Sequence, residues 1–387
     1  MKRFLKWAGV ALIAITVPAA ALAVWNREEI ARLLAVNSLF DADRIVSNFS
    51  EMEELFLTRD MPLGEAPVLP LLEGPPLTPP DGYETWVQDR AVTSIVVLDQ
   101  GQIVLEDYLL GTEPTDRRIS WSVAKSYLSV LTGILLAEGA IDSIDDPVTN
   151  YVPELAGTAY DQATLRDLLT MSSGVVFDED YLDPNSDINR MGRVLALGQS
   201  MDGFTSGLTE SERAPGIRWN YVSIDTHVIG MVLRGATGRE IPDLLAEKVL
   251  APIGLEETPA YITDGHGVAF VLGGLLMTTR DYARFGRIIA QDGAGILPAD
   301  WIKASTTPQA NTMPGARQYG YQWWVPADAR EGEAFAHGIY GQYIYIDRSR
   351  DIVIAMSAAD RQFRWSNVQP GNIEMFRRIS DTLMERR

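Results

Sequence analysis

The segment from Val123 to Glu138 constrains the fold more than any other part of the chain, because its apolar residues occupy nearly every face of the helix that they predict. Gly139 follows as a stop signal, and Ser120 is available as an N-cap. A helix that is apolar all round must be covered by other elements, so the pattern predicts a central, buried helix. Lys125 is then a cation inside a hydrophobic core.

Ser122 and Lys125 form a Ser-x-x-Lys pair at the start of this helix. Residues three apart lie on one face of a helix, so the hydroxyl and the amine are predicted to be neighbours. Burial lowers the pKa of a lysine towards a neutral amine that can accept a proton, and the Ser122 amide can point at a substrate carbonyl oxygen. The pattern arises by chance in about one such chain in four, so a lysine that extends to the surface remains an alternative.

The composition excludes several other kinds of active site. The 387 residues include no cysteine, which rules out disulfides, thiolate catalysis and Cys-ligated metals. The histidines, His227, His266 and His337, do not have a zinc-hydrolase spacing, so no metal site is predicted. No nucleotide-binding glycine motif occurs, so no cofactor is expected. A net charge of −19 argues against nucleic acid as a partner, and serine–lysine chemistry becomes the leading option.

The N-terminus predicts export. Basic residues within positions 1–6 precede an apolar run over residues 7–25, which as a helix would span roughly 28 Å, about one hydrocarbon core. The positive end belongs in the cytoplasm, so the rest of the chain is expected on the periplasmic side of the inner membrane. The sequence up to Ala23 resembles a signal-peptidase site, and cleavage there competes with an uncleaved anchor, which the length of the run slightly favours.

A helical and proline-rich extension covers residues 26–81. A helical pattern continues from Arg27 to Phe40, and seven prolines follow between residues 41 and 81. Leucines are interleaved with these prolines, which favours an extended strap docked on the folded unit over a disordered linker.

Residues 82–387 are predicted to form one folded unit with strands near both ends and helices between them. The expected strands are 93–98, 102–107, 319–325, 342–347 and 352–357, and the main expected helices are 165–171, 224–234, 241–249, 280–291 and 373–384. This order predicts an α+β fold, in which an antiparallel sheet flanked by helices (82–139 and 270–387) carries an inserted all-helical lobe (140–269). The active site is expected in the cleft between the two lobes.

Three motifs follow one another along the chain: Ser122-x-x-Lys125, then Tyr221-Val-Ser223, then a His-Gly-Ile-Tyr-Gly run that starts at His337. In this order they resemble the serine beta-lactamase and penicillin-binding-protein superfamily, and in particular its class C-like branch of esterases and 6-aminohexanoate-dimer hydrolases. The resemblance covers about residues 85–385 and implies a beta-lactamase/transpeptidase-like fold. Supporting phrases lie at 165–174, 272–275 and 319–323.

The resemblance implies a role for each motif. Ser122 is expected to be acylated, Lys125 to accept its proton, and Tyr221 to carry a proton to the leaving group. A lysine close to the phenol is expected to hold the pKa of Tyr221 down. The oxyanion hole is assigned to the amides of Ser122 and Ile339, with the Tyr340 amide as the alternative for the second.

The chain departs from the superfamily pattern at two positions. Ser223 replaces the asparagine of Tyr-x-Asn, and His337 replaces a permanent lysine cation with a titratable imidazole, for which a structural role is as plausible as a catalytic one. Tyr181 lies in an acidic run that resembles a substrate-closing loop, although a solvated loop is the simpler interpretation. Together with Tyr340, these residues are the expected substrate contacts.

The sequence therefore favours an exported serine hydrolase that cleaves an ester or amide of a small substrate through a Ser122 acyl-enzyme, without metal or cofactor. A membrane-anchored sensor or D,D-peptidase that deacylates slowly is the alternative, and an inactive scaffold is the third. Neither the natural substrate nor the oligomeric state follows from the sequence. Membrane contact is expected only if residues 7–25 are retained.

Overall fold

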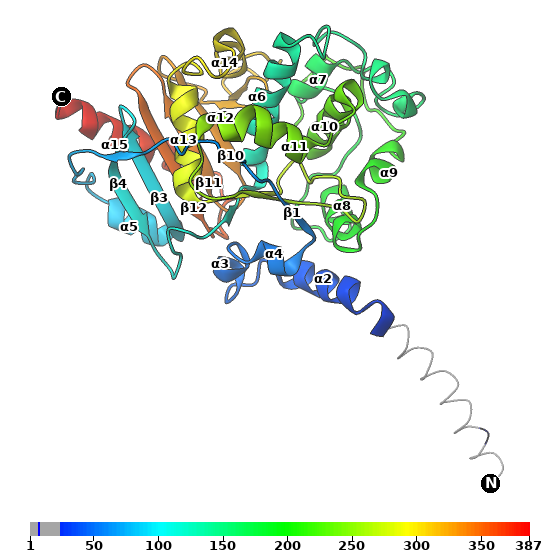
Figure 1. Cartoon of the computed structure of the whole chain (residues 1–387), viewed down its shortest axis with the longest axis horizontal. Helices are drawn as coiled ribbons and strands as arrows, with labels where there is room; N and C mark the ends of the chain where they lie inside the picture. Colours follow the sequence, from blue (N-terminus) through cyan, green and yellow to red (C-terminus); the bar gives the residue numbers. More distant parts are fainter. Residues whose placement is uncertain (1–6, 8–23) are drawn as a thin grey trace.

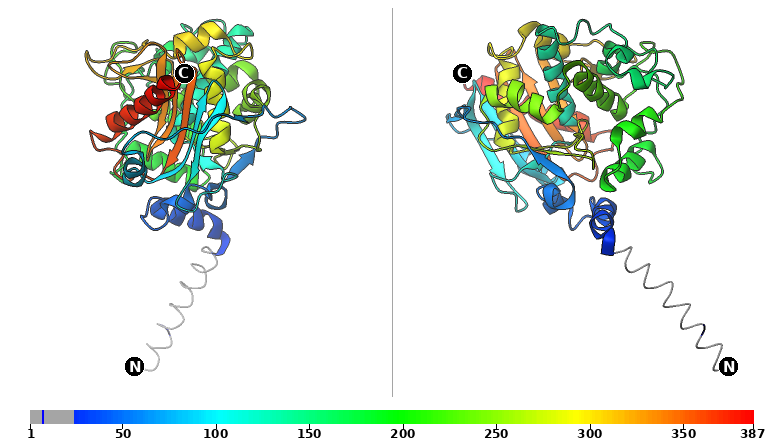
Figure 2. Two further views of the ribbon diagram at one scale, coloured as in Figure 1. Left: turned by 90° about the vertical axis from the view of Figure 1, so that its left-hand side faces the viewer. Right: turned by 45° about the vertical axis from the view of Figure 1, so that its right-hand side comes forward.

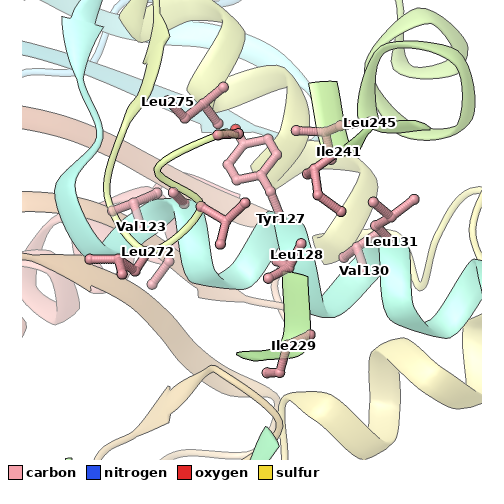
Figure 3. Close-up of a cluster of buried hydrophobic side chains, with 14 of the residues drawn as sticks. Val123, Tyr127, Leu128, Val130, Leu131, Ile229, Ile241, Leu245, Leu272 and Leu275 are labelled. Atoms are coloured by element: carbon pink, nitrogen blue, oxygen red, sulfur yellow. The ribbon is translucent and has the colours of Figure 1, made fainter. Parts of the chain in front are cut away.

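The helix that carries Lys125 lies at the centre of the fold. In this computed structural model, which describes Trp7 and residues 24–387, a 3-10 turn at Trp121–Val123 leads into α6 (Ala124–Ala137). Every residue of α6 from Ala124 to Leu135 is buried, and Figure 3 shows side chains from several segments packed around it. The predicted cap is wrong, because Ser120 has helical dihedral angles and its hydroxyl donates to the carbonyl of Trp121 at 3.0 Å.

The main sheet of the described residues has eight strands in the order β2-β4-β3-β12-β11-β10-β9-β8. All its pairs are antiparallel except the short β2–β4 pair. A second sheet of four strands, in the order β1-β6-β7-β5, was not predicted. The strands are β1 (Thr58–Asp60), β2 (Leu72–Glu73), β3 (Val92–Asp99), β4 (Gln102–Tyr108), β5 (Arg118–Ile119), β6 (Ala260–Ile262), β7 (Leu275–Met277), β8 (Gln318–Tyr319), β9 (Trp324–Val325), β10 (Glu333–Gly338), β11 (Gln342–Asp347) and β12 (Ile352–Ala358).

Helices cover both faces of the main sheet. On one face α13 packs against β3, β11 and β12, and α15 and α5 lie on the other face (Figures 1 and 2). There Phe376 of α15 contacts Trp86 of α5 and Tyr343 of β11 in a second cluster of buried side chains. The helices are α2 (Arg27–Ser38), α3 (Ile45–Asn48), α4 (Met52–Leu55), α5 (Tyr83–Asp89), α6, α7 (Leu165–Leu169), α8 (Asp187–Ala196), α9 (Met201–Ser206), α10 (Ser223–Thr237), α11 (Ile241–Leu245), α12 (Ala251–Ile253), α13 (Thr279–Ala290), α14 (Ala299–Ser305) and α15 (Val368–Glu385), with 3-10 turns at Val148–Asn150 and Pro153–Leu155.

The segment between α6 and β6 is helical, and α7 begins as the sequence predicts. The Thr164 hydroxyl accepts from the Asp167 N–H, and the Asp167 carboxylate accepts from the Thr164 N–H, which completes a capping box. The helix predicted over 241–249 is instead α11, a π-helical turn and α12 in succession. Pro252 has no N–H to donate into the preceding turn, which explains the break. The lobe boundaries at 140 and 269 remain a prediction.

The strand predicted over 319–325 is wrong, because the segment folds back on itself as β8 and β9. Gln322 lies in the connecting turn with φ of 62° and with a buried side chain. Its Nε2 donates to the carbonyls of Leu168 and Leu169, and its Oε1 accepts from the hydroxyl of Thr226. Its own carbonyl accepts from Ser126 at 2.8 Å. Gln322 therefore ties α6, α7 and α10 to the sheet.

The proline-rich strap is docked, as the sequence predicts. The Leu69 N–H donates to the carbonyl of Gly254 at 2.8 Å, and the Leu77 N–H donates to Val104 at 2.7 Å. Leu72 is exposed, so not every interleaved leucine packs inward. Most of the predicted anchor, residues 7–25, lies outside the described residues. Among the residues that are described, no helix is both long enough and apolar enough to cross a membrane.

Candidate active site

The structure brings Ser122 and Lys125 together. Nζ of Lys125 lies 2.9 Å from Oγ of Ser122 and donates to the carbonyl of Leu272 at 2.7 Å. The lysine is only 1% exposed, so it does not extend to the surface. Burial lowers its pKa to about 7, although the carboxylate of Glu179 acts in the opposite direction. The amine is therefore partly neutral near pH 7 and able to accept a proton.

The end of β10 lies against the backbone of the nucleophile. A Cβ on Gly338 would lie 2.6 Å from the Ser120 carbonyl oxygen and 3.0 Å from the Ser122 nitrogen, so only glycine permits this approach. Ile339 follows directly, and both Ser122 and Ile339 line the same pocket. This placement is compatible with an oxyanion hole formed by the two amides. The Tyr340 residue has φ of 61° and contributes its ring to the pocket.

Tyr221 lies beside the pair, but its predicted ionisation is wrong. Its ring centroid is 5.4 Å from Nζ of Lys125, and the ring stacks on Trp324 at 5.3 Å. Burial and the nearby charge of Glu179 raise the pKa of Tyr221 above its usual value. The expectation of a lowered pKa required a fully charged lysine, whereas burial leaves Lys125 partly neutral. The phenol is therefore protonated at rest and can donate a proton.

Glu179 belongs to the site, although the sequence did not predict it. Its carboxylate accepts from the hydroxyl of Tyr181 at 2.5 Å, from the N–H of Ser223 at 2.9 Å and from the Ser223 hydroxyl. The carboxylate therefore caps the N-terminus of α10, where the helix dipole favours negative charge. An acidic residue two positions before Tyr181 was the only sequence signal, and the surrounding acidic run made it look solvated.

The predicted substrate contacts divide into two groups. Tyr181, Ser223 and Tyr340 line the pocket next to Ser122, whereas His337 does not. His337 stacks on Tyr343, its partner in the β10–β11 register, at a centroid distance of 4.4 Å. Burial, helped by the charge of Arg317, lowers the pKa of His337 to about 3, so the expectation of an imidazole that titrates near neutral pH is wrong.

The pocket encloses about 100 Å³ and is mainly apolar. The pocket opens at Ser122, and Lys125 and Tyr221 are not among its lining residues. Most of the lining residues come from three segments: the N-terminal extension, α8 and the loop before β7. The lining residues are Val36, Leu39, Phe40, Met52, Phe56, Trp121, Ser122, Tyr181, Ile188, Asn189, Gly192, Leu195, Ser223, Ile262, Phe270, Leu272, Gly273, Ile339 and Tyr340.

Known proteins resemble this chain across most of its length. A family model described as Beta-lactamase matches residues 84–367. A 6-aminohexanoate-dimer hydrolase of Paenarthrobacter ureafaciens is 29% identical over 309 residues, which cover 74% of this chain and 78% of that protein. A beta-lactamase of Pseudomonas fluorescens is 24% identical across 44% of this chain and 46% of its own length.

Solved structures share the fold. A Bacillus anthracis structure assigned to the 6-aminohexanoate-dimer hydrolases has a TM-score of 0.78 and 22% identity, and the match covers 90% of this chain and 96% of that one. A D-stereospecific amidohydrolase from a Streptomyces species has a TM-score of 0.55 and 21% identity, over 75% of this chain and 97% of that one. The expected α+β fold is therefore confirmed. Given the extent of the family match, the chain belongs to the beta-lactamase family and is a serine hydrolase of the beta-lactamase fold.

Proposed function

We propose that this hydrolase cleaves an ester or amide bond of a small substrate through an acyl-enzyme on Ser122. The observation that carries the proposal is the 2.9 Å contact between Oγ of Ser122 and Nζ of a lysine that burial makes partly neutral. A hydroxyl next to a neutral amine is an activated nucleophile. The similarity to a 6-aminohexanoate-dimer hydrolase supports an amide or ester as the bond that is cleaved.

Acylation begins when Oγ of Ser122 attacks the substrate carbonyl carbon and its proton passes to Nζ of Lys125. The oxyanion that forms accepts hydrogen bonds from the amides of Ser122 and Ile339. Tyr221 gives its phenolic proton to the leaving alcohol or amine, and the Lys125 ammonium returns a proton to Tyr221. One proton has then moved from the serine to the leaving group, and the acyl group is bound to Ser122.

Deacylation uses the same groups in reverse. A water molecule attacks the acyl carbonyl carbon while one of its protons passes to the base formed by Tyr221 and Lys125. The carbon–oxygen bond to Ser122 breaks, and Oγ takes a proton from Lys125. The products are a carboxylic acid and the free enzyme, and no metal or cofactor takes part.

We also propose that the protein acts after export. The apolar run over residues 7–25 follows basic residues, which is typical of a signal or an anchor whose C-terminal side is exported. Mass spectrometry of the protein isolated from its host tests this proposal. A mature N-terminus after Ala23 would indicate release, and an intact chain in the membrane fraction would indicate an anchor. An intact chain in the cytosolic fraction would contradict export.

A paired assay on wild type and Ser122→Ala tests the hydrolase. Labelling by a fluorophosphonate is read by mass spectrometry, and turnover is followed with p-nitrophenyl acetate and butyrate. Wild type is expected to label and turn over, and the variant to do neither. A folded wild type that neither labels nor turns over would refute the proposal. A burst without turnover would favour the slowly deacylating sensor instead.

A further inference from the structure

We propose that the N-terminal extension is part of the active site and forms a subsite for a short apolar acyl chain. This inference rests on the proposed acyl-enzyme at Ser122. Five side chains of the extension, Val36, Leu39, Phe40, Met52 and Phe56, line the pocket that opens at the nucleophile. The part of the extension from Val36 to Phe56, which precedes the strap, therefore selects the substrate in addition to covering the domain.

An aromatic cluster packs the extension against Trp121 and Tyr340, which are the chain neighbours of Ser122 and Ile339. Phe40 stacks on Tyr340 with centroids 4.6 Å apart and planes 13° apart, and it lies 5.7 Å from Trp121. Phe49 contacts the same two rings edge-on at 5.6 Å. Trp121 precedes the nucleophile and Tyr340 follows Ile339, so the wall of the pocket is continuous with the catalytic backbone. The Phe49 carbonyl also accepts from the N–H of Ile119 at 3.1 Å.

The position of the pocket assigns it to the acyl part of the substrate. Tyr221 protonates the leaving group, and therefore the leaving group lies on the Tyr221 side of Ser122. Tyr221 is absent from the pocket lining, whereas Ile339 and Tyr340 are part of it. The group in the pocket is thus the one that stays bonded to Oγ after the leaving group departs.

The size and polarity of the pocket define the acyl group. A dry, apolar protein cavity of about 150 Å³ accommodates benzene, so a pocket of about 100 Å³ accommodates roughly four carbon atoms. The described side chains that line it carry no lysine, arginine or carboxylate, so a charged acyl group would lose its hydration without a partner. The predicted substrate class is an ester or amide of a short aliphatic acid.

Two substitutions change the pocket in opposite directions. Gly192 lies in α8 and lines the pocket, and a Cβ added there meets no atom within 4 Å, so Gly192→Leu fills the subsite without a clash at Cβ. Phe40→Ala removes one wall and lengthens the subsite. Leu55→Ala is the matched control, because Leu55 is a partly buried residue of α4 that packs on the core without lining this pocket.

The experiment measures kcat/KM of the full chain for p-nitrophenyl acetate, butyrate, hexanoate and decanoate. Each additional buried methylene is expected to raise kcat/KM about fourfold, so wild type is expected to prefer butyrate to acetate by about 15-fold. The kcat/KM for decanoate is expected to be no higher than that for butyrate. Gly192→Leu is expected to bring the butyrate-to-acetate ratio close to one, and Phe40→Ala to move the best substrate to hexanoate. Leu55→Ala is expected to keep the wild-type profile. Identical profiles in all four proteins would overturn the subsite.

A binding measurement separates this inference from the proposed chemistry. The Ser122→Ala variant cannot be acylated. Binding of pentanamide to this variant, measured by ligand-observed NMR, therefore reports on the pocket alone. Competition between pentanamide and butyrate is expected, and Gly192→Leu in the same background is expected to abolish the binding of pentanamide. Absence of pentanamide binding in an enzyme that is otherwise active on esters would overturn the subsite but leave the hydrolase intact. Binding without any ester turnover in wild type would support the subsite and refute the hydrolase.

Discussion

Replacing Lys125 by methionine is expected to abolish acylation and to stabilise the folded protein. The pKa of this lysine falls from 10.5 to about 7 on folding, and holding a lysine neutral at pH 7 therefore costs about 4 kcal/mol. Methionine has a similar length and no charge, so the variant avoids this cost. It also leaves the Leu272 carbonyl without its donor, which costs about 2 kcal/mol. The net expectation is a gain of about 2 kcal/mol at pH 7.

The dependence of this gain on pH provides the sharper test. Between pH 7 and 10.5 the unfolded chain binds a proton at Lys125 that the folded chain does not, so wild-type stability rises with pH across this window. The methionine variant lacks that rise, and its advantage is expected to disappear by about pH 9. Urea unfolding of both proteins at pH 7 and pH 9, with fluorophosphonate labelling in parallel, measures both effects. Lys303→Met, on the exposed part of α14, is the control.

A variant that is less stable than wild type at pH 7, or a difference that does not change with pH, would refute the argument that burial holds this amine neutral. Labelling that survives in Lys125→Met would refute its role as the base.

The remaining predictions concern the pH profile and the leaving group. Because the neutral amine of Lys125 is the reactive form, kcat/KM is expected to rise about tenfold from pH 6 to pH 8. The Glu179 carboxylate raises the pKa of Lys125, so Glu179→Gln is expected to shift the inflection of this profile to lower pH. A shift to higher pH would contradict this assignment. Tyr221→Phe is expected to slow amide hydrolysis about 100-fold or more and to affect p-nitrophenyl esters far less, since p-nitrophenolate leaves without a proton. Equal losses on both substrates would exclude Tyr221 as the donor to the leaving group.

Local patterns in the sequence are sufficient to predict much of the framework. Apolar residues on nearly every face predict α6 and its burial, runs rich in β-branched residues predict β3 and β4, and the Thr164/Asp167 pair predicts the start of α7. Each of these signals acts within one element. The pairing of Ser122 with Lys125 is equally local, because one helical turn sets their distance.

Features that depend on distant contacts could not be predicted in this way. The inward orientation of Glu179 requires the N-terminus of α10 as its partner, and nothing within its own acidic loop signals this contact. The turn at Gln322 requires buried acceptors on α7, without which the segment resembles one continuous strand. The wall contributed by Phe40 depends on Tyr340, which lies near the other end of the chain.

The strand order of the main sheet also determines when the active site can form during synthesis. β3, close to the start of the domain, pairs with β12, and the turn that holds Ser122 packs against β10 and β11. Long-range pairings of this kind form late, and none is available until the last part of the chain has left the ribosome. Until then the environment that excludes water from Lys125 is incomplete, and a solvated lysine keeps its proton. An unfinished chain therefore carries the nucleophile without an active base, so the chemistry begins only when the fold is complete.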